Sequence, residues 1–129
     1  MKLKNSKLHD LIEQYLREYN SFNIDGMVDL LHENIHFKNI SNGEVNAETK
    51  GTEEFRALAE QSVQIFSQRC QVIKSITLTD VKAEVEIDYE GILSIDLPNG
   101  MKAGESLKLQ GKSIYQMKDE KLVLIEDYS

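Results

Sequence analysis

The sequence has few of the residues that build disulfide frameworks, metal clusters or cationic surfaces. It contains a single cysteine (Cys70), a single proline and no tryptophan. One cysteine excludes an internal disulfide and a four-cysteine metal site. Positively charged residues are also few: the sequence has 15 Lys and Arg but 22 Asp and Glu, which gives a net charge of −7. We therefore expect no nucleic-acid partner, since binding a phosphate backbone needs a basic face.

Long hydrophobic runs are lacking as well. Three lysines, Lys2, Lys4 and Lys7, begin the chain, but polar residues interrupt each apolar stretch that follows them. The sequence therefore predicts neither a signal peptide nor a membrane span, and we expect a cytoplasmic protein. The 129 residues are 40% hydrophobic and 29% charged. This balance fits one globular domain over residues 1–129, large enough for a core and one internal pocket.

Hydrophobic residues recur at helical spacing in the first half of the chain. The spacing predicts one helix over about 6–19 and a second that begins after Asn23, a residue suited to capping, and ends near Glu33–Asn34. A third helix is expected to begin at Gly51–Thr52, with Phe66 on its apolar face.

Strand patterns fill the remainder. A short strand is predicted over 35–39, before a hairpin turn at Asn42–Gly43. From residue 69 onward the hydrophobic period is two, as in Val85, Ile87 and Tyr89, and a last strand runs from Leu122 to Tyr128. Three helices followed by long strands predict an α+β fold, with the helices on one face of a strongly curved antiparallel sheet that encloses a cavity.

Several short motifs occur in a characteristic order. They are a first helix with Tyr15, then Asn23-Ile24-Asp25-Gly26-Met27, Ile35-His36-Phe37, Gly51-Thr52-Glu53-Glu54-Phe55 and a closing Lys121-Leu122-Val123-Leu124-Ile125-Glu126-Asp127-Tyr128. Over nearly the whole chain this order resembles the nuclear transport factor 2-like superfamily, in its SnoaL-like, ketosteroid isomerase-like branch. The resemblance implies a cone-shaped roll with a pocket at its wide end. Because the superfamily includes isomerases, polyketide cyclases, epoxide hydrolases and non-catalytic proteins, it leaves the function open.

The resemblance to ketosteroid isomerases can be followed residue by residue. It places Tyr15 at the oxyanion-hole tyrosine, Asn39 at the general-base aspartate and Ser113 at the second oxyanion donor. Since an asparagine cannot take up a proton, the resemblance implies that the isomerase route of proton abstraction is absent.

The resemblance to epoxide hydrolases is partial too. Asn39 and Asp127 match the asparagine and the base that hold the reactive water, but Phe37 stands in place of the tyrosine. Glu86 stands in place of the arginine of the acid–base relay, so the relay is not expected. Asp88 aligns with the second acid, yet strand alternation favours the outer face for it, and the sequence leaves its side open.

Asp127 is the candidate acid–base residue. Val123, Ile125 and Asp127 share one strand face, so Asp127 is expected at the edge of the apolar pocket, where loss of solvent would raise its pKa. A solvated carboxylate at a strand end is the alternative. The expected ligand-binding residues are Tyr15, Asn39, Ser113, Phe37, Phe55, Tyr89 and Tyr115. Packing in the core would explain the aromatic members of this set equally well.

Two further patterns suggest chemistry that we do not expect. His32-Glu33-Asn34-Ile35-His36 satisfies the H-E-x-x-H pattern of zinc peptidases, but that chemistry needs both histidines on one continuous helix. The predicted helix ends inside the motif, so no metal site is expected. Cys70 lacks a histidine or a basic cluster beside it and is expected to be an inert thiol. No cofactor is implied.

Two functions remain open. One is a pocket for a small, largely apolar molecule, with isomerase-, cyclase- or hydrolase-like acid–base chemistry. The other is a non-catalytic domain of the same fold that serves dimerisation or protein contact. Leu122 and Leu124 lie opposite Ile125 in the predicted strand, which favours an apolar outer sheet face and a homodimer. No membrane partner is expected.

Overall fold

A computed structural model describes residues 3–129 as three helices and six strands. In chain order they are α1 (Leu3–Asn20), α2 (Ile24–Asp29), β1 (Leu31–Ser41), β2 (Glu44–Lys50), α3 (Thr52–Val63), β3 (Phe66–Leu78), β4 (Lys82–Leu93), β5 (Ser106–Lys118) and β6 (Lys121–Tyr128). The predicted α+β class is confirmed. No helix in this part of the chain is long and apolar enough to cross a membrane.

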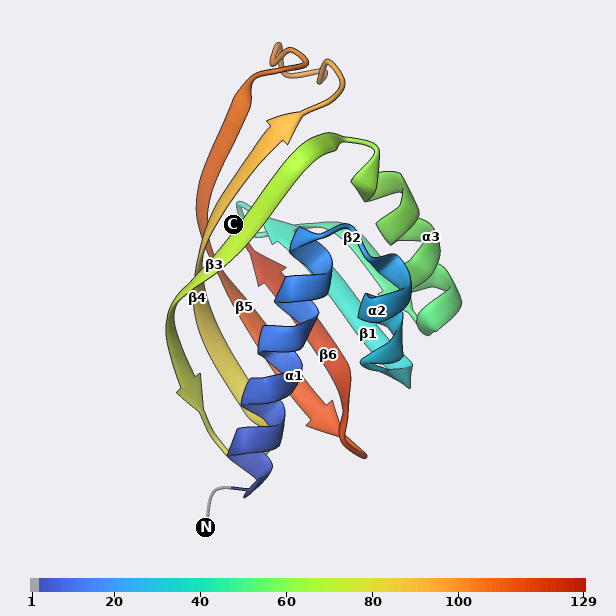
Figure 1. The fold of residues 1–129 in the computed structure, drawn as a ribbon, viewed down its shortest axis with the longest axis vertical. Helices are drawn as coiled ribbons and strands as arrows, with labels where there is room; N and C mark the ends of the chain where they lie inside the picture. The colour runs from blue at the N-terminus through green and yellow to red at the C-terminus, as the bar shows by residue number, and fades with distance from the viewer. Residues whose placement is uncertain (1–2) are drawn as a thin grey trace.

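The strands form one open sheet in the order β2-β1-β6-β5-β4-β3 (Figure 1). Neighbouring strands are antiparallel, as predicted, except for β1 and β6, which run parallel. This pairing lays the last strand of the chain beside the first. Residues 39 and 127, far apart in sequence, thereby become direct neighbours in the sheet.

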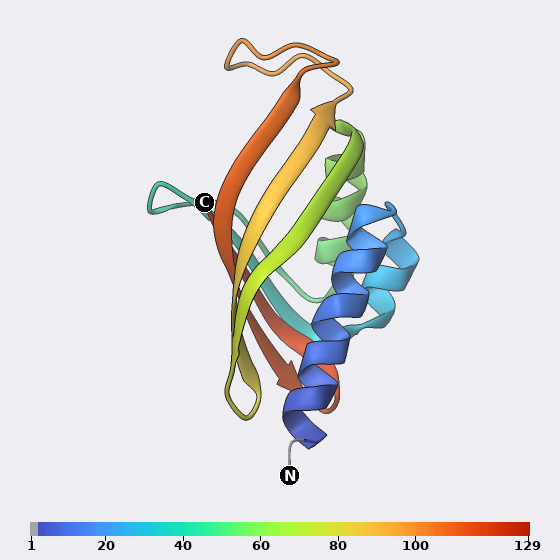
Figure 2. The same ribbon diagram turned by 60° about the vertical axis from the view of Figure 1, so that its left-hand side comes forward.

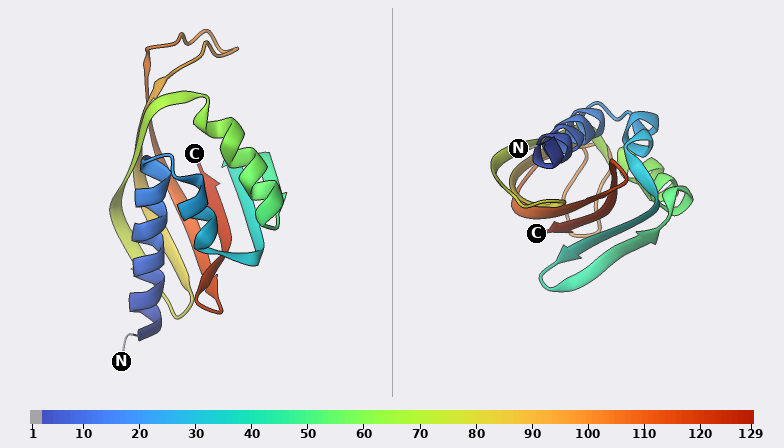
Figure 3. Two further views of the ribbon diagram at one scale, coloured as in Figure 1. Left: turned by 45° about the vertical axis from the view of Figure 1, so that its right-hand side comes forward. Right: turned by 90° about the horizontal axis from the view of Figure 1, so that it is seen from below.

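The three helices cover one face of the sheet, which curves around them (Figure 3). Strands β4 and β5 continue past the helices at one end, where the loop between them lies (Figure 2). The curved sheet and the helices therefore surround a common interior (Figure 3).

The core forms where the apolar side of α1 meets the inner face of the sheet. On α1 the buried residues follow the spacing of one helix face: Leu8, Leu11, Ile12, Tyr15 and Leu16. They pack with buried residues of the central strands, among them Val85, Tyr115, Leu122 and Ile125. Burial of this continuous apolar surface fixes α1 against the sheet.

The second helix is shorter than the sequence predicts. Asn23 caps it as expected, because its side chain accepts a hydrogen bond from the Gly26 amide at 3.1 Å. The helix ends at Asp29, however, and not near Glu33–Asn34. Leu31 already belongs to β1 and pairs with Leu122 of β6. Strand pairing between buried leucines thus overrides the local helical spacing.

The third helix and the hairpin also test the local predictions. The turn at Asn42–Gly43 is confirmed, with positive φ of 53° and 80° at its two residues. Gly51 forms the N-cap of α3 with a φ of 86°. The helix ends at Val63, and Phe66 is the first residue of β3 rather than part of the helix face. Its ring still faces the interior, where it packs against Tyr89.

Leu122 does not lie where the prediction of a homodimer needs it. The sequence places it on the outer sheet face, but it is fully buried in the core of its own chain. The register of β5 and β6 shifts between Gln116 and Met117, next to the partner of Leu122. This shift turns Leu122 inward, so it contributes nothing to an apolar outer surface.

Candidate functional site

Three polar residues lie in one row across the middle of the sheet. Asp127 of β6 is in register with Asn39 of β1 on one side and with Ser113 of β5 on the other. Residues that are directly opposite each other on neighbouring strands place their side chains on the same face. The row therefore brings a carboxyl, an amide and a hydroxyl together on the inner face of the sheet.

Two adjoining cavities meet at this row. The outer cavity, of about 290 Å³, has apolar walls that include Ile65, Phe66, Ile87, Tyr89, Leu107 and Leu109. The inner cavity, of about 140 Å³, is lined by Tyr15, Met27, Phe37, Phe55, Leu58 and Ala59 among others. Both cavities share Asn39, Asp127, Tyr19 and Ser62. Asp127 thus stands at the junction of two largely apolar spaces.

The environment of Asp127 favours a protonatable carboxyl. Burial raises its pKa from 3.8 to about 6, and the hydrogen bond from Ser113 opposes part of that rise. The Ser113 hydroxyl donates this bond to Oδ1 of Asp127 at 2.6 Å. A carboxyl that titrates near pH 6 is present in both forms near neutrality, which is the property a general acid or base needs.

Three tyrosines, Tyr15, Tyr19 and Tyr89, line the two cavities, and their hydroxyls are neutral. Tyr19 donates a hydrogen bond to the Tyr89 hydroxyl at 3.2 Å. Burial raises the pKa of Tyr15, Tyr19 and Tyr89 above the ordinary value of 10.0. These groups therefore keep their protons at physiological pH, and a neutral hydroxyl can donate a hydrogen bond but does not serve as a base.

The structure brings most of the predicted site residues together. Phe37 and Phe55 line the inner cavity, with their rings edge to face at a centroid distance of 5.7 Å. Tyr89 and Ser113 line the outer cavity, and Tyr15 lines the inner one. Tyr115 is the exception.

Tyr115 lies two residues along β5 from Ser113, opposite Ile125 of β6. It is fully buried in the core beside Tyr15, with ring centroids 6.1 Å apart, and lines neither cavity. Its placement fits the alternative of core packing.

Arg69 is a polar residue of the site that sequence reasoning missed. It lies on β3, lines the inner cavity and is only 5% exposed. Arg69, Gln71 and Ile73 alternate toward the interior, and this alternation is the sequence pattern that could have identified Arg69 as a site residue. Ile76 and Leu78, farther along the strand, have the opposite parity and obscure the pattern. A register shift between Ile73 and Ser75 reverses which side chains face inward.

Comparisons with known proteins fit this geometry. Residues 12–125 match the SnoaL-like domain family. The chain belongs to this family. Similar solved structures include a putative polyketide cyclase from Xanthomonas campestris pv. campestris (TM-score 0.83, 16% identity, covering 96% of this chain and 90% of that one). An LEH-like epoxide hydrolase from M. tuberculosis is also similar (TM-score 0.75, 14% identity, 95% and 82% covered).

A third similar structure is a hypothetical protein with a ketosteroid isomerase-like fold from Catenulispora acidiphila, in complex with trimethylamine (TM-score 0.75, 11% identity, 92% and 84% covered). At such identities the likeness concerns the fold alone. No protein of curated function matches the chain. The superfamily that the sequence resembles is thus confirmed, while the chemistry of this SnoaL-like domain has to be argued from its own residues.

The side on which Asp88 lies is settled by the structure. It lines an open groove on the outer face of the sheet, with Cys70 and Val72 of β3 and Lys108 of β5. We call this the sheet groove. Asp88 is not among the residues that line either cavity of the SnoaL-like domain. A relay from Asp88 to Asp127 through the interior therefore has no geometric basis.

The H-E-x-x-H pattern does not form a zinc-peptidase site in this SnoaL-like domain. His32 and His36 both lie on β1 rather than on a helix. His32 contacts Asp119 at 3.3 Å, whereas His36 contacts Glu48 at 2.5 Å. The two imidazoles are thus engaged by different acidic partners, and the helical geometry that the H-E-x-x-H chemistry needs is missing.

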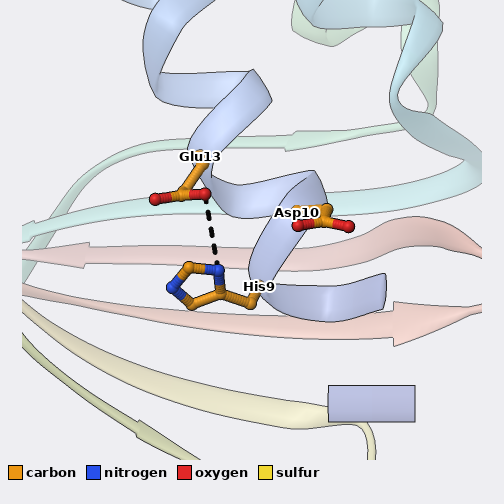
Figure 4. A group of neighbouring side chains, drawn as sticks. All are labelled: His9, Asp10 and Glu13. Carbon is orange, nitrogen blue, oxygen red and sulfur yellow. Dashed lines mark ion pairs between the residues drawn. The ribbon is translucent and has the colours of Figure 1, made fainter. Parts of the chain in front are cut away.

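One other cluster has metal-binding side chains. His9, Asp10 and Glu13 lie near one another on α1 (Figure 4). His9 Nδ1 is 3.4 Å from Glu13 Oε1, one helical turn away. An exposed pair at this spacing is ordinary helix-surface electrostatics and needs no metal ion to explain it.

Proposed function

We propose that this SnoaL-like domain binds a small, largely apolar molecule in its two cavities and that Asp127 transfers a proton to or from that molecule. The supporting observation is the position of Asp127 at the junction of the cavities, with a pKa raised to about 6 by burial. A buried carboxyl in a largely apolar cavity is destabilising in its charged form, because that form loses solvation, and such groups are often found at functional sites.

The neighbouring groups support a proton-transfer step. The Ser113 hydroxyl holds one carboxyl oxygen of Asp127 and leaves the other oxygen for the ligand. The Asn39 amide lies beside it in the same cross-strand row. Neutral tyrosine hydroxyls can donate to an oxygen on which charge develops. Isomerase-, cyclase- and hydrolase-like reactions all use such a step, so the proposal names the step that they share.

A generic proton-transfer substrate tests this directly. A nitrobenzisoxazole is a small, flat, apolar molecule whose carbon-bound proton is removed by a base while its N–O bond breaks, which releases a coloured phenolate. The ionised Asp127 carboxylate would accept that proton. We expect wild-type protein to accelerate the reaction, with a rate that rises with pH through about 6 as Asp127 ionises.

The matched controls are two aspartate-to-asparagine variants on opposite faces of the sheet. Asp127→Asn should abolish the acceleration, because the amide cannot take up the proton. Asp88→Asn removes the same charge from the sheet groove and should leave the rate unchanged. No acceleration by the wild-type protein, or an equal acceleration by Asp127→Asn, contradicts the proposal.

A second proposal is that the outer sheet face pairs with another copy of the chain. It is supported by an exposed apolar residue of the sheet groove, Val72, which is 53% exposed. We expect a dimer in sedimentation measurements and a monomer after Val72→Asp. Val45→Asp, an equally exposed position on β2, is the control that should remain dimeric. A monomeric wild-type protein contradicts this second proposal.

A further inference from the structure

We propose that Arg69 binds a carboxylate group of the ligand in the inner cavity, so that the ligand is an amphipathic acid with an apolar body and one anionic end. The inference rests on the proposed function, because it takes the cavities to be the binding site. It goes further by assigning the chemical class of the ligand and the residue that selects it.

The burial of Arg69 is the first observation. Arginine is one of the residues least often buried, and a buried guanidinium is normally paired. Arg69 is 5% exposed, yet it forms no ion pair with any residue from 7 to 129. Its Nη2 is buried and has no hydrogen-bond partner. The guanidinium therefore retains unused donor capacity next to a cavity.

The rest of the side chain is held in place. Nε donates to the carbonyl oxygen of Tyr19 at 3.0 Å. The guanidinium lies 3.6 Å from the centroid of the Tyr19 ring and 4.7 Å from that of Phe22. Stacking on aromatic faces fixes the plane of an arginine and leaves its edge for a bidentate partner. A carboxylate fits that edge because its two oxygens match the spacing of the guanidinium donors.

A purely structural role does not account for the charge. Attachment of α1 to β3 is already provided by Asn20, whose amide nitrogen donates to the Gln71 carbonyl at 3.2 Å and whose Oδ1 accepts from the Gln71 amide at 2.8 Å. The contact of Arg69 with Tyr19 uses one of five donors. Leaving a buried charge with unused donors is destabilising unless something else pairs with it.

The charges along the inner cavity favour an anion under defined conditions. Of the described side chains that line it, Arg69 is the one cation and Asp127 the one acid, while Tyr15 and Tyr19 are neutral. Protonation of Asp127 leaves the cavity with a net positive charge, and ionisation of Asp127 cancels that charge. A carboxylate ligand should therefore bind more tightly as the pH falls through the titration of Asp127.

The test compares two probes of similar shape, of which only one carries a charge. Benzoate and benzamide have the same ring and nearly the same shape, but one is an anion and the other is neutral. Isothermal titration calorimetry gives their affinities, and NMR chemical-shift changes at cavity residues locate the binding site. For wild-type protein at pH 6 we expect benzoate to bind at least about tenfold more tightly than benzamide, the advantage of a charge-assisted pair.

Two arginine variants carry the comparison. Arg69→Met should remove the preference for benzoate and leave benzamide binding within about twofold. Arg56→Met removes a charge from a surface ion pair with Asp25 and should keep the preference. If Arg69→Met fails to fold, Arg69→Lys keeps the charge but loses the bidentate fork, and should retain only part of the preference.

The outcomes separate the two proposals. If both probes bind at the cavities with equal affinity, or if Arg69→Met keeps the preference, Arg69 does not select anions, although the cavities still bind small molecules. If neither probe shifts the resonances of cavity residues, the proposed function fails and the inference fails with it. A preference of wild-type protein for benzoate that disappears in Arg69→Met supports both.

Discussion

Replacing Asp127 by asparagine should make the protein more stable at neutral pH. The folded-state pKa of Asp127 is raised from 3.8 to about 6, so the native state holds its proton more tightly than the unfolded chain does. Stability from this group is therefore fully present below pH 3.8 and is lost as the pH rises to about 6. An asparagine keeps the hydrogen-bond acceptor for Ser113 and carries no charge to desolvate.

The size of the effect follows from the two pKa values. At about 1.4 kcal/mol for each tenfold change in the proton equilibrium, the rise is equivalent to at most about 3 kcal/mol. Because Asp127 as a whole residue is only partly buried, we expect Asp127→Asn to stabilise the protein by about 1–3 kcal/mol at pH 7, and by nearly nothing at pH 4.

Urea unfolding of both proteins at a series of pH values measures this difference. Taking the difference between variant and wild type cancels the titration of the other carboxyls. Asp10→Asn, on the exposed side of α1, is the control and should change stability by less than about 0.5 kcal/mol at any pH. A stability difference that does not grow between pH 4 and pH 7, or a destabilised Asp127→Asn, would refute the reasoning.

Three other predictions concern single contacts. Ser113→Ala should raise the pKa of Asp127 above about 6, because the variant lacks the hydrogen bond that lowers it; NMR titration measures this, and an unchanged midpoint contradicts it. Asn23→Ala should cost about 1 kcal/mol in urea unfolding through loss of the α2 cap; no loss would mean that the cap is dispensable. Leu122→Ala should cost about 2–5 kcal/mol, as for a buried leucine, and Leu124→Ala less, since Leu124 is only partly buried; equal costs would contradict the inward placement of Leu122.

Local sequence signals predict the parts of the fold that depend on short-range physics. The cap at Asn23, the turn at Asn42–Gly43 and the start of α3 at Gly51 follow from the conformations that these residues favour. Alternation along β4 correctly separates the buried Val85 from the acidic outer face. These signals lie within a few residues of the structure that they determine.

The errors arise where distant segments meet. The end of α2 is decided by the pairing of Leu31 with Leu122, two residues that are 91 positions apart. The inward placement of Arg69 depends on a register shift farther along β3. Local hydrophobic periodicity cannot predict a parallel strand pairing or a register shift, because both are set by the packing of the whole sheet.

The candidate site also has one part that local sequence patterns predict and another that depends on how distant strands pair. Alternation in the last strand predicts that Asp127 shares a face with Ile125, and the structure places Asp127 on the cavity walls. The alignment of Asn39, Asp127 and Ser113 in one row requires the strand order β1-β6-β5, which only the three-dimensional structure supplies.

The claim on which the proposed function depends is that Asp127 is a desolvated carboxyl at the meeting point of two apolar cavities. Carbon-13 NMR titration of its carboxyl resonance measures this most directly. The structure predicts a midpoint near pH 6 that moves when a small molecule enters the cavities. A midpoint near the ordinary value of 3.8, unaffected by any bound probe, would show a solvated carboxylate and contradict the claim.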